Sequence, residues 1–191
     1  SYNQVCLMYL VASHQQSFIT LAYQQFDQAN NMTDQLNALL ALNHHECVER
    51  EQALLEFYQR WQSNPLVVNK WLQLQASATV ANTFSTVMGL LQHEAFDIYN
   101  HNNVYSLLCS FSENNIHFHE IGGAGYQLIA DQVLAIQSHN PQVAVRVLQP
   151  LTYWRCFDAR QGQLMRQQLQ RIAESQNLST DVYEIVNKSL S

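Results

Sequence analysis

Glycine and proline are scarce in this sequence, with 5 Gly and 3 Pro among 191 residues. Sandwiches and barrels need many tight turns, and these two residue types supply most of them, so those β architectures are excluded. No apolar run approaches the roughly 20 residues that cross a bilayer. A basic segment leading into an apolar core, the mark of a secretory leader, is also absent. We therefore predict a cytoplasmic protein that does not insert into a membrane.

Positive charge is also in short supply, with 9 Lys and Arg against 15 Asp and Glu and a formal net charge of −6. Residues 1–145 hold 3 of the cations and 11 of the carboxylates, which gives this part a net charge of −8. Nucleic acids are bound through basic surfaces, and most of this chain would repel a phosphate backbone. Nucleic acid is therefore excluded as a partner.

The four cysteines lie far apart and none forms a CxxC pair. This spacing fits neither a zinc ribbon nor a disulfide-rich scaffold, and we expect reduced, buried thiols. They are Cys6, Cys47, Cys109 and Cys156.

What the sequence does contain is apolar residues at helical spacing along most of its length. The predicted stripes are Leu36-Leu39-Leu40-Asn43, Cys47-Leu54-Leu55-Tyr58-Trp61, Val80-Phe84-Val87-Leu90-Leu91, Leu128-Ile129-Val133-Leu134-Ile136 and Leu164-Leu169-Ile172. They predict an all-α fold of about ten to twelve short helices. Short helices joined by short connections commonly stack as antiparallel pairs, so we expect a curved superhelix of the armadillo or HEAT kind.

Helix starts can be placed from capping residues and prolines. Thr33-Asp34 predicts a helix from about residue 34, and Asn64-Pro65 and Asn140-Pro141 each put a capping Asn before a proline. Asp158 and Ser179 are expected to open the last two helices. The Gly122–Gly125 stretch is interpreted as a loop leading into a helix from about Tyr126, because the strand and Lys-Ser/Thr of a phosphate loop are missing.

Catalytic and metal-binding patterns are not found. A zinc-hydrolase helix needs two His four residues apart, and the residue four after His93 is Asp97. His44-His45-Glu46 and His117-Phe118-His119 lack the remaining ligands, so we interpret these histidines as solvated or hydrogen-bonded. Sequence alone leaves open a nucleophile assembled by the fold, although no GxSxG elbow is present.

One predicted helix separates an apolar from a polar side. After Asn140-Pro141, the apolar residues are Val143, Ala144, Val147 and Leu151, and the polar ones are Gln142, Arg146, Gln149 and Tyr153. The spacing by itself favours a solvated face. A cavity-facing amide and guanidinium that bind a peptide are the alternative.

The same segment resembles the end of the bacterial aminopeptidase N family. The matching stretches, in order, are Asn31-Met32-Thr33-Asp34, residues 70–76, Gly89-Leu90-Leu91-Gln92-His93, Gly125-Tyr126, Asn140-Pro141-Gln142-Val143-Ala144-x-Arg146 with Pro150-Leu151, Asp158-Ala159 with Gln161, and Leu178-Ser179-x-Asp181-x-Tyr183-Glu184. The resemblance extends from about Cys6 to Leu190. It implies that residues 1–191 are a single C-terminal helical domain of a longer multidomain enzyme.

The start of the chain is consistent with this interpretation. It begins at Ser1-Tyr2 and continues directly into Val5, Leu7, Met8 and Leu10, which we expect to be helical. A cut inside a longer protein would leave such a start, and so would a cleaved precursor.

The resemblance further implies a zinc metallopeptidase that removes N-terminal amino acids from peptides. Its zinc and general base would lie on another domain of the same chain, and this domain would enclose the active-site cavity and shape substrate access. Gln142 and Arg146 correspond to the family's substrate-contacting Gln and Arg, which shifts our preference to a binding role. On its own this chain is predicted to be inactive. A free-standing helical solenoid that binds protein partners is the alternative.

Two segments depart from the family pattern. Residues 100–105 stand where a proline and basic residues are expected, and residues 121–124 replace an acidic, glycine-rich loop. Both lie where the family lines its channel, so we expect the charge at the channel entrance and the peptide preference to differ.

Overall fold

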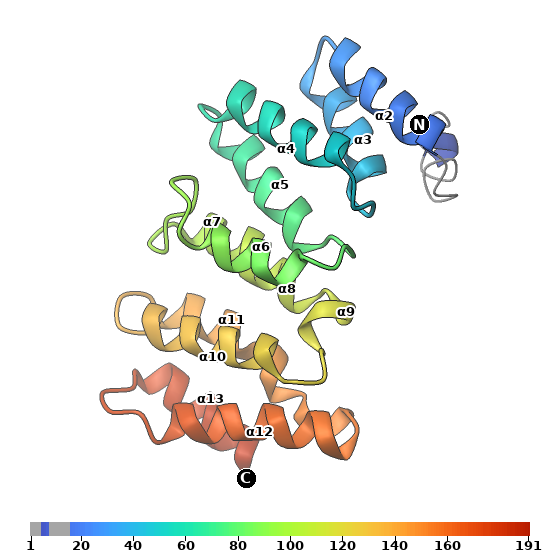
Figure 1. Ribbon diagram of the computed structural model, residues 1–191. Helices are drawn as coiled ribbons and strands as arrows, with labels where there is room; N and C mark the ends of the chain where they lie inside the picture. The colour runs from blue at the N-terminus through green and yellow to red at the C-terminus, as the bar shows by residue number, and fades with distance from the viewer. Residues whose placement is uncertain (1–4, 8–15) are drawn as a thin grey trace. The chain divides into compact units, whose positions relative to one another are not determined.

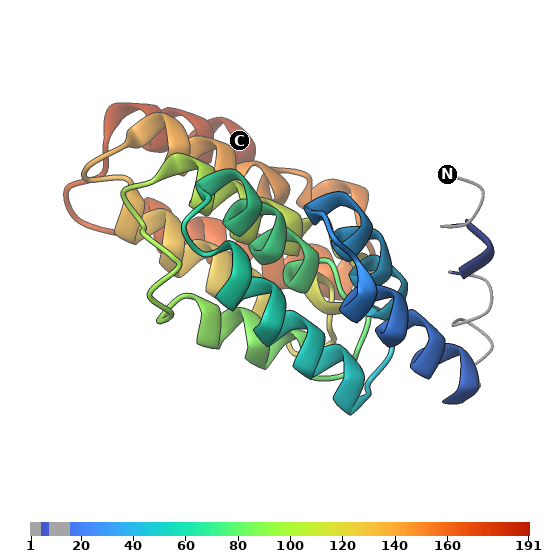
Figure 2. The same cartoon turned by 90° about the horizontal axis from the view of Figure 1, so that it is seen from above.

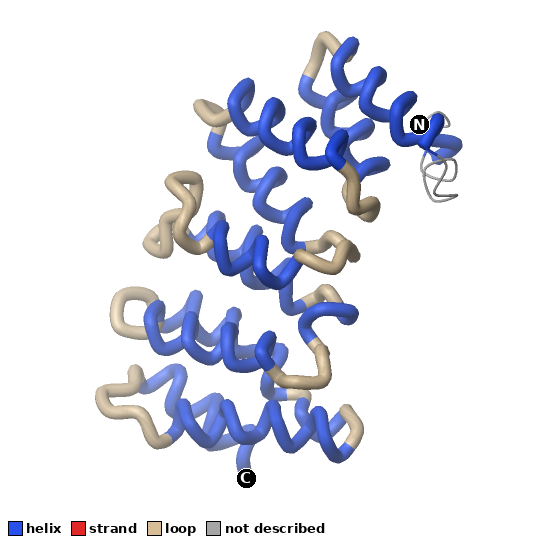
Figure 3. The backbone as a smooth tube through the Cα atoms, viewed as in Figure 1, coloured by secondary structure: helices blue, strands red, loops and turns tan. Residues whose placement is uncertain are grey.

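The computed structural model describes residues 5–7 and 16–191, and within them every regular element is a helix (Figure 3). The all-α prediction is confirmed, and the twelve α-helices from α2 to α13 agree with the expected number. Val5 and Leu7 are helical as expected, whereas Met8 and Leu10 lie outside the described residues. No described helix is both long and apolar enough to span a membrane.

The chain divides into two compact units, Ser1–Leu90 and Leu91–Ser191. In the described part of the first unit, helices that follow one another along the chain pack together: α2 on α3, α3 on α4, α4 on α5 and α5 on α6 (Figures 1 and 2). Their bounds are α2 Gln16–Gln28, α3 Met32–Leu42, α4 Val48–Trp61, α5 Pro65–Ala76 and α6 Thr83–Leu90.

The core of the first unit differs in detail from the predicted stripes. On α3 the buried residues are Gln35, Ala38, Leu39, Ala41 and Leu42, while Leu36 and Leu40 are half-exposed. On α4, Leu54 is buried but Leu55 is 57% exposed. The spacing of apolar residues predicted the helices themselves correctly. It misplaced the buried face because α3 is covered on two sides, by α2 and by α4, and so buries small and polar residues between its leucines.

A buried arginine joins three helices of this unit. Arg50 on α4 is 2% exposed, and its guanidinium donates hydrogen bonds to the carbonyl oxygen (3.0 Å) and the side-chain oxygen (3.4 Å) of Asn43. The amide nitrogen of Asn43 in turn donates to the carbonyl oxygen of Leu74 on α5 (2.8 Å). Because a buried cation is costly without partners, this network fixes the turn between α3 and α4.

The second unit is built around α11. Its helices are α7 His101–Val104, the π-helix η1 Tyr105–Cys109, α8 Ser110–Ser112, α9 Asn115–Phe118, α10 Ala124–Ile136, α11 Pro141–Thr152, the 3-10 helix η2 Trp154–Cys156, α12 Ala159–Ala173 and α13 Thr180–Leu190 (Figure 1). Helix α11 packs against α10, α12, α13, η1 and η2. Residues 101–112 form one continuous helical segment whose middle is the π-helix.

Capping was predicted well at four helix starts and less well at two. The side chains of Asn64, Asn140, Asp158 and Ser179 each accept a hydrogen bond from the first turn of the following helix, as expected. Helix α3 begins at Met32 and not near residue 34, because Asn31 is the residue whose side chain caps it. Helix α10 begins at Ala124, two residues before the predicted start.

Two glycines explain the early start of α10. Gly123 has a φ of +73°, a left-handed conformation that glycine adopts without strain. Gly125 lies against the backbone of α9, where a Cβ atom would come within 2.6 Å of the Phe118 carbonyl oxygen. The glycine stretch is therefore partly the first turn of a closely packed helix.

The cysteines are free, as predicted, but they are less buried than expected. Cys6, Cys47 and Cys109 are half-buried and Cys156 is exposed. The positions of two of them explain this, since Cys47 stands at the N-cap of α4 and Cys156 lies in the short helix η2.

Candidate functional site

Helix α11 has the two-sided character that the sequence predicts. Its buried residues are Val143, Ala144, Val147, Leu148 and Leu151. Gln142, Arg146, Gln149 and Tyr153 are all exposed, and the Gln149 amide nitrogen lies 3.3 Å from the Tyr153 hydroxyl. Asn140 and Pro141 set the start of the helix, and thereby the direction in which Gln142 and Arg146 emerge.

Arg146 is held against the π-helix. Its guanidinium carbon lies 4.5 Å from the centre of the Tyr105 ring, within the range of a cation–π contact. The guanidinium is also close enough to the Cys109 thiol to lower the pKa of that thiol. Within the described residues the ion pairs join Arg50 to Glu51 and Arg171 to Asp131, so no carboxylate there neutralises Arg146.

The Cys109 thiol is a neutral neighbour of this cation. Burial raises the pKa of Cys109 above its ordinary value, and the nearby Glu113 carboxylate raises it further, while the charge and hydrogen bond of Arg146 oppose both effects. A raised thiol pKa keeps the sulfur protonated at neutral pH. Cys109 therefore contacts the guanidinium without cancelling its charge.

Gln142 faces different surroundings. It lines a hollow of about 290 Å³ between α11 and α13, together with Val145, Asp181, Glu184 and Ile185. The two predicted site residues are thus both exposed and one turn apart on α11, but Gln142 lines a hollow together with acidic side chains of α13, whereas Arg146 lies against Tyr105.

A second hollow of about 340 Å³ continues along α11 and α13. It is lined by Gln149, Thr152, Arg155, Ile185, Lys188 and Ser189. The groove between these helices therefore carries carboxylates at one end and cations at the other.

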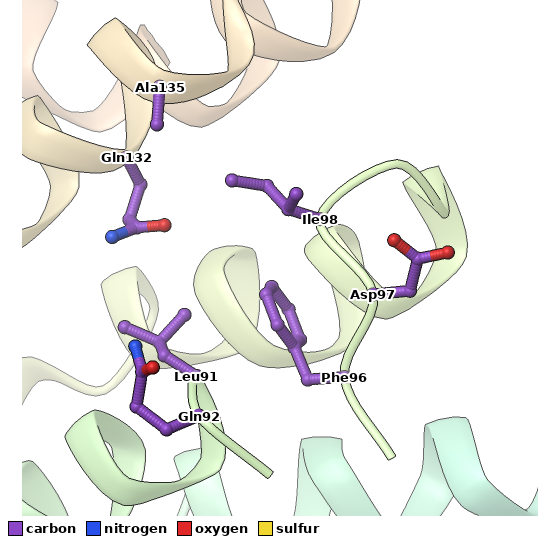
Figure 4. A pocket seen from close by; sticks show the side chains of 7 residues that line it. All are labelled: Leu91, Gln92, Phe96, Asp97, Ile98, Gln132 and Ala135. Atoms are coloured by element: carbon purple, nitrogen blue, oxygen red, sulfur yellow. The ribbon is translucent and has the colours of Figure 1, made fainter. Parts of the chain in front are cut away.

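A larger cavity of about 440 Å³ lies beside α10. Its walls are the apolar side chains of Leu91, Phe96, Ile98 and Ala135, with the amides of Gln92 and Gln132 (Figure 4). The remaining lining residue, Asp97, is engaged locally, since its carboxylate accepts a hydrogen bond from the Tyr99 backbone N–H (2.9 Å). The cavity therefore offers apolar walls, neutral amides and one carboxylate, and no second titratable side chain lines it.

The interpretation of the histidines as solvated or hydrogen-bonded is confirmed at three positions, but not at His117, which is buried and whose Nε2 has no hydrogen-bond partner in the described part of the chain. His44 pairs with the Thr79 hydroxyl (3.2 Å), and His93 accepts from the Ala95 backbone N–H (3.0 Å). His119 lies 2.7 Å from the Tyr126 hydroxyl. Within residues 5–7 and 16–191, no group of three His, Cys, Asp or Glu is arranged to hold a metal ion.

Sequence reasoning missed Tyr105 and Cys109 as neighbours of Arg146. Tyr105 falls in the segment 100–105 that departs from the family pattern, which marked the region but not the contact. A π-helix has no reliable sequence signature, so the direction of both side chains was not predictable from spacing.

The fold is that of an all-helical domain of packed helix pairs, and comparison with known families agrees. Residues 1–191 match the family described as a domain of unknown function (DUF3458_C) with ARM repeats. The chain belongs to this DUF3458_C family of ARM-repeat domains. The predicted armadillo-like architecture is confirmed.

Similarity to individual proteins confirms the predicted resemblance to the aminopeptidase N family. The chain is 37% identical over 190 residues to aminopeptidase N of Escherichia coli and 35% identical over 189 residues to that of Haemophilus influenzae, covering 99% and 98% of this chain. The crystal structure of Legionella pneumophila aminopeptidase A in complex with aspartic acid matches with a TM-score of 0.91 and 34% identity over 98% of this chain. The chain spans 22% of the length of each of these proteins.

Proposed function

We propose that residues 1–191 are the single C-terminal domain of a zinc aminopeptidase that removes N-terminal amino acids from peptides. The observation that carries this proposal is the 37% identity to Escherichia coli aminopeptidase N across 190 residues. The domain would enclose the active-site cavity and shape substrate access. A likeness to three aminopeptidases favours this role over a free-standing interaction module.

Zinc would be held outside this chain. The histidines and carboxylates of the described residues do not fit a zinc site, because none of them forms a group of three ligands. On the catalytic domain, bound zinc supplies polarisation of the scissile carbonyl and activation of water. The catalytic domain of the same polypeptide is thus the proposed partner, in the cytoplasm, and peptides are the proposed substrates.

The contribution of this chain would be binding and positioning. Arg146 offers an un-neutralised guanidinium to a backbone carbonyl or to the distal carboxylate of a short peptide. Gln142 offers an amide, able to donate or to accept, to the first side chain of the peptide. Both emerge from the first two turns of α11, whose buried face fixes their direction. A substrate held in one orientation needs less reorganisation to reach the transition state.

The test is steady-state kinetics of the full-length enzyme with Gln142→Ala and Arg146→Ala. Loss of a hydrogen bond to a charged group is expected to lower kcat/KM about 10- to 100-fold for Arg146→Ala. Loss of a neutral bond is expected to lower it about 2- to 10-fold for Gln142→Ala. Gln163→Ala and Arg160→Ala, at exposed positions of α12, are the matched controls. Unchanged kcat/KM in both α11 variants, across alanyl and aspartyl peptides, would refute the binding role.

A further inference from the structure

The guanidinium of Arg146 contacts the Tyr105 ring and still has N–H donors available to bind a ligand. The guanidinium carbon lies over the Tyr105 ring, 4.5 Å from its centre, so the ring covers part of the group. The N–H donors of a guanidinium lie along its edge, so stacking leaves them available for hydrogen bonds. The Cys109 thiol is a second neighbour of the guanidinium. The remaining donors can address a carboxylate or carbonyl oxygen in a planar arrangement.

The tyrosine that supports Arg146 stands on an irregular but firmly packed helix. Tyr105 and Cys109 are the first and last residues of the π-helix η1. Single π turns within α-helices are rare and occur frequently at functional sites. The same helical segment is anchored by fully buried apolar side chains, which are Val104, Leu107, Leu108 and Phe111. The support is therefore a fixed part of the unit.

Fixing this side chain matters because an exposed arginine otherwise samples many rotamers. Ordering such a chain on substrate binding costs conformational entropy, and a side chain held in advance avoids much of that cost. The two contacts with Arg146 come from a different helix, and η1 packs directly against α11. Free and substrate-bound forms would then share one arginine conformation.

We infer that Tyr105 is a positioning residue for Arg146: its ring holds the guanidinium in the orientation that binds peptide substrates, with Cys109 as a lesser support. This inference rests on the proposed function. It makes Tyr105 a determinant of specificity for peptides that extend beyond the first residue, because the carbonyl or carboxylate that the proposed function assigns to Arg146 belongs to that part of the peptide. Short aminoacyl substrates with no peptide bond beyond the scissile one are largely insensitive to it.

The experiment uses the full-length enzyme with Tyr105→Leu, Tyr105→Phe, Arg146→Ala and the double variant Tyr105→Leu/Arg146→Ala. KM and kcat are measured for trialanine and for alanyl p-nitroanilide. Tyr105→Leu is expected to raise KM for trialanine about 2- to 30-fold, the range of a cation–π contact, and to change kcat by less than about twofold. Tyr105→Phe keeps the ring and is expected to stay within about twofold of the parent in KM.

The double variant separates positioning from general damage. In the Arg146→Ala background, Tyr105→Leu is expected to add no further change in KM, because the group it positions is gone. Tyr183→Leu, at an exposed tyrosine of α13, is the matched control and is expected to leave KM unchanged. If Tyr105→Leu lowers the melting temperature by more than about 5 °C, Tyr105→Met, which fills a comparable space without a ring, takes its place.

The possible failures are distinguishable. If Arg146→Ala leaves KM for trialanine unchanged, the substrate-binding role in the proposed function fails. If Arg146→Ala raises KM but Tyr105→Leu does not, or if the two effects add in full, the positioning role of Tyr105 is overturned and the proposed function stands. An effect of Tyr105→Phe as large as that of Tyr105→Leu also overturns it, since the hydroxyl and not the ring would then matter.

Discussion

The contact between α9 and α10 gives a sharp prediction for the substitution Gly125→Ala. Gly125 lies in the first turn of α10, and an added Cβ would come within 2.6 Å of the carbonyl oxygen and 3.1 Å of the Cα of Phe118. Both are backbone atoms and cannot rotate away, so α10 must shift from α9. The shift would also disturb the 2.7 Å contact between His119 and Tyr126, which directly follows this glycine.

The size of the effect follows from two opposing contributions. Overpacking of a close contact costs about 1–3 kcal/mol. Replacing glycine by alanine in a helix stabilises the folded state by about 0.5–1 kcal/mol, because the unfolded chain has less conformational freedom to lose. We expect a net loss of about 1–2 kcal/mol in the free energy of unfolding. For a chain of this size that lowers the melting temperature by about 2–8 °C.

The assay is thermal unfolding followed by circular dichroism at 222 nm, with Gly89→Ala as the matched control. Gly89 lies on α6, and an added Cβ would meet nothing within 4 Å, so this variant is expected to gain about 0.5–1 kcal/mol. A Gly125→Ala protein as stable as the parent, or as stabilised as Gly89→Ala, would refute the close packing of α9 on α10.

Two further predictions concern stability and its pH dependence. Arg50→Leu leaves the oxygens of Asn43 without their donor, so it is expected to lower the free energy of unfolding by about 2–4 kcal/mol. The change is measured as the shift of the urea midpoint. A shift smaller than that of a surface substitution would contradict the hydrogen-bond network of Arg50. Burial lowers the pKa of His119 below its ordinary value of 6.5, so the unfolded chain takes up the proton first as pH falls. The contribution of His119 to the free energy of unfolding is therefore present above pH 6.5 and is lost as the pH falls below that value. In His119→Asn the amide oxygen can replace Nδ1 beside Tyr126, so this variant is expected to show a smaller fall in melting temperature between about pH 7.5 and 5.5 than the parent. An equal fall in both proteins would exclude His119 as the source of the pH dependence.

Local signals in the sequence predicted the helical class and four of the six helix starts that we placed. Asn140-Pro141 determined the start of α11 because a capping amide and a proline are both suited to a first turn. At α3 the structure uses Asn31 as the cap, whereas the sequence analysis placed the start at Thr33-Asp34. When several residues that can cap a helix lie close together, tertiary packing decides which of them becomes the N-cap. Local sequence does not describe this packing.

The candidate site was predictable only along one helix. Gln142 and Arg146 could be placed on one face of α11 because their spacing is a property of a single helix. The contact of Arg146 with Tyr105 joins residues 41 positions apart through a π-helix. Such a contact depends on tertiary packing, and no periodicity in the sequence reports it.

The central claim is that this chain completes a zinc aminopeptidase, and reconstitution tests it most directly. The purified chain is mixed with the zinc-bearing remainder of its enzyme, prepared without residues 1–191 and shown to be folded and zinc-loaded, and hydrolysis of alanyl p-nitroanilide is followed. The account predicts that the two parts co-elute on size exclusion and that the mixture hydrolyses the substrate far faster than the remainder alone, while the chain alone is inactive. A folded, zinc-loaded remainder that neither binds the chain nor gains activity from it would contradict the account.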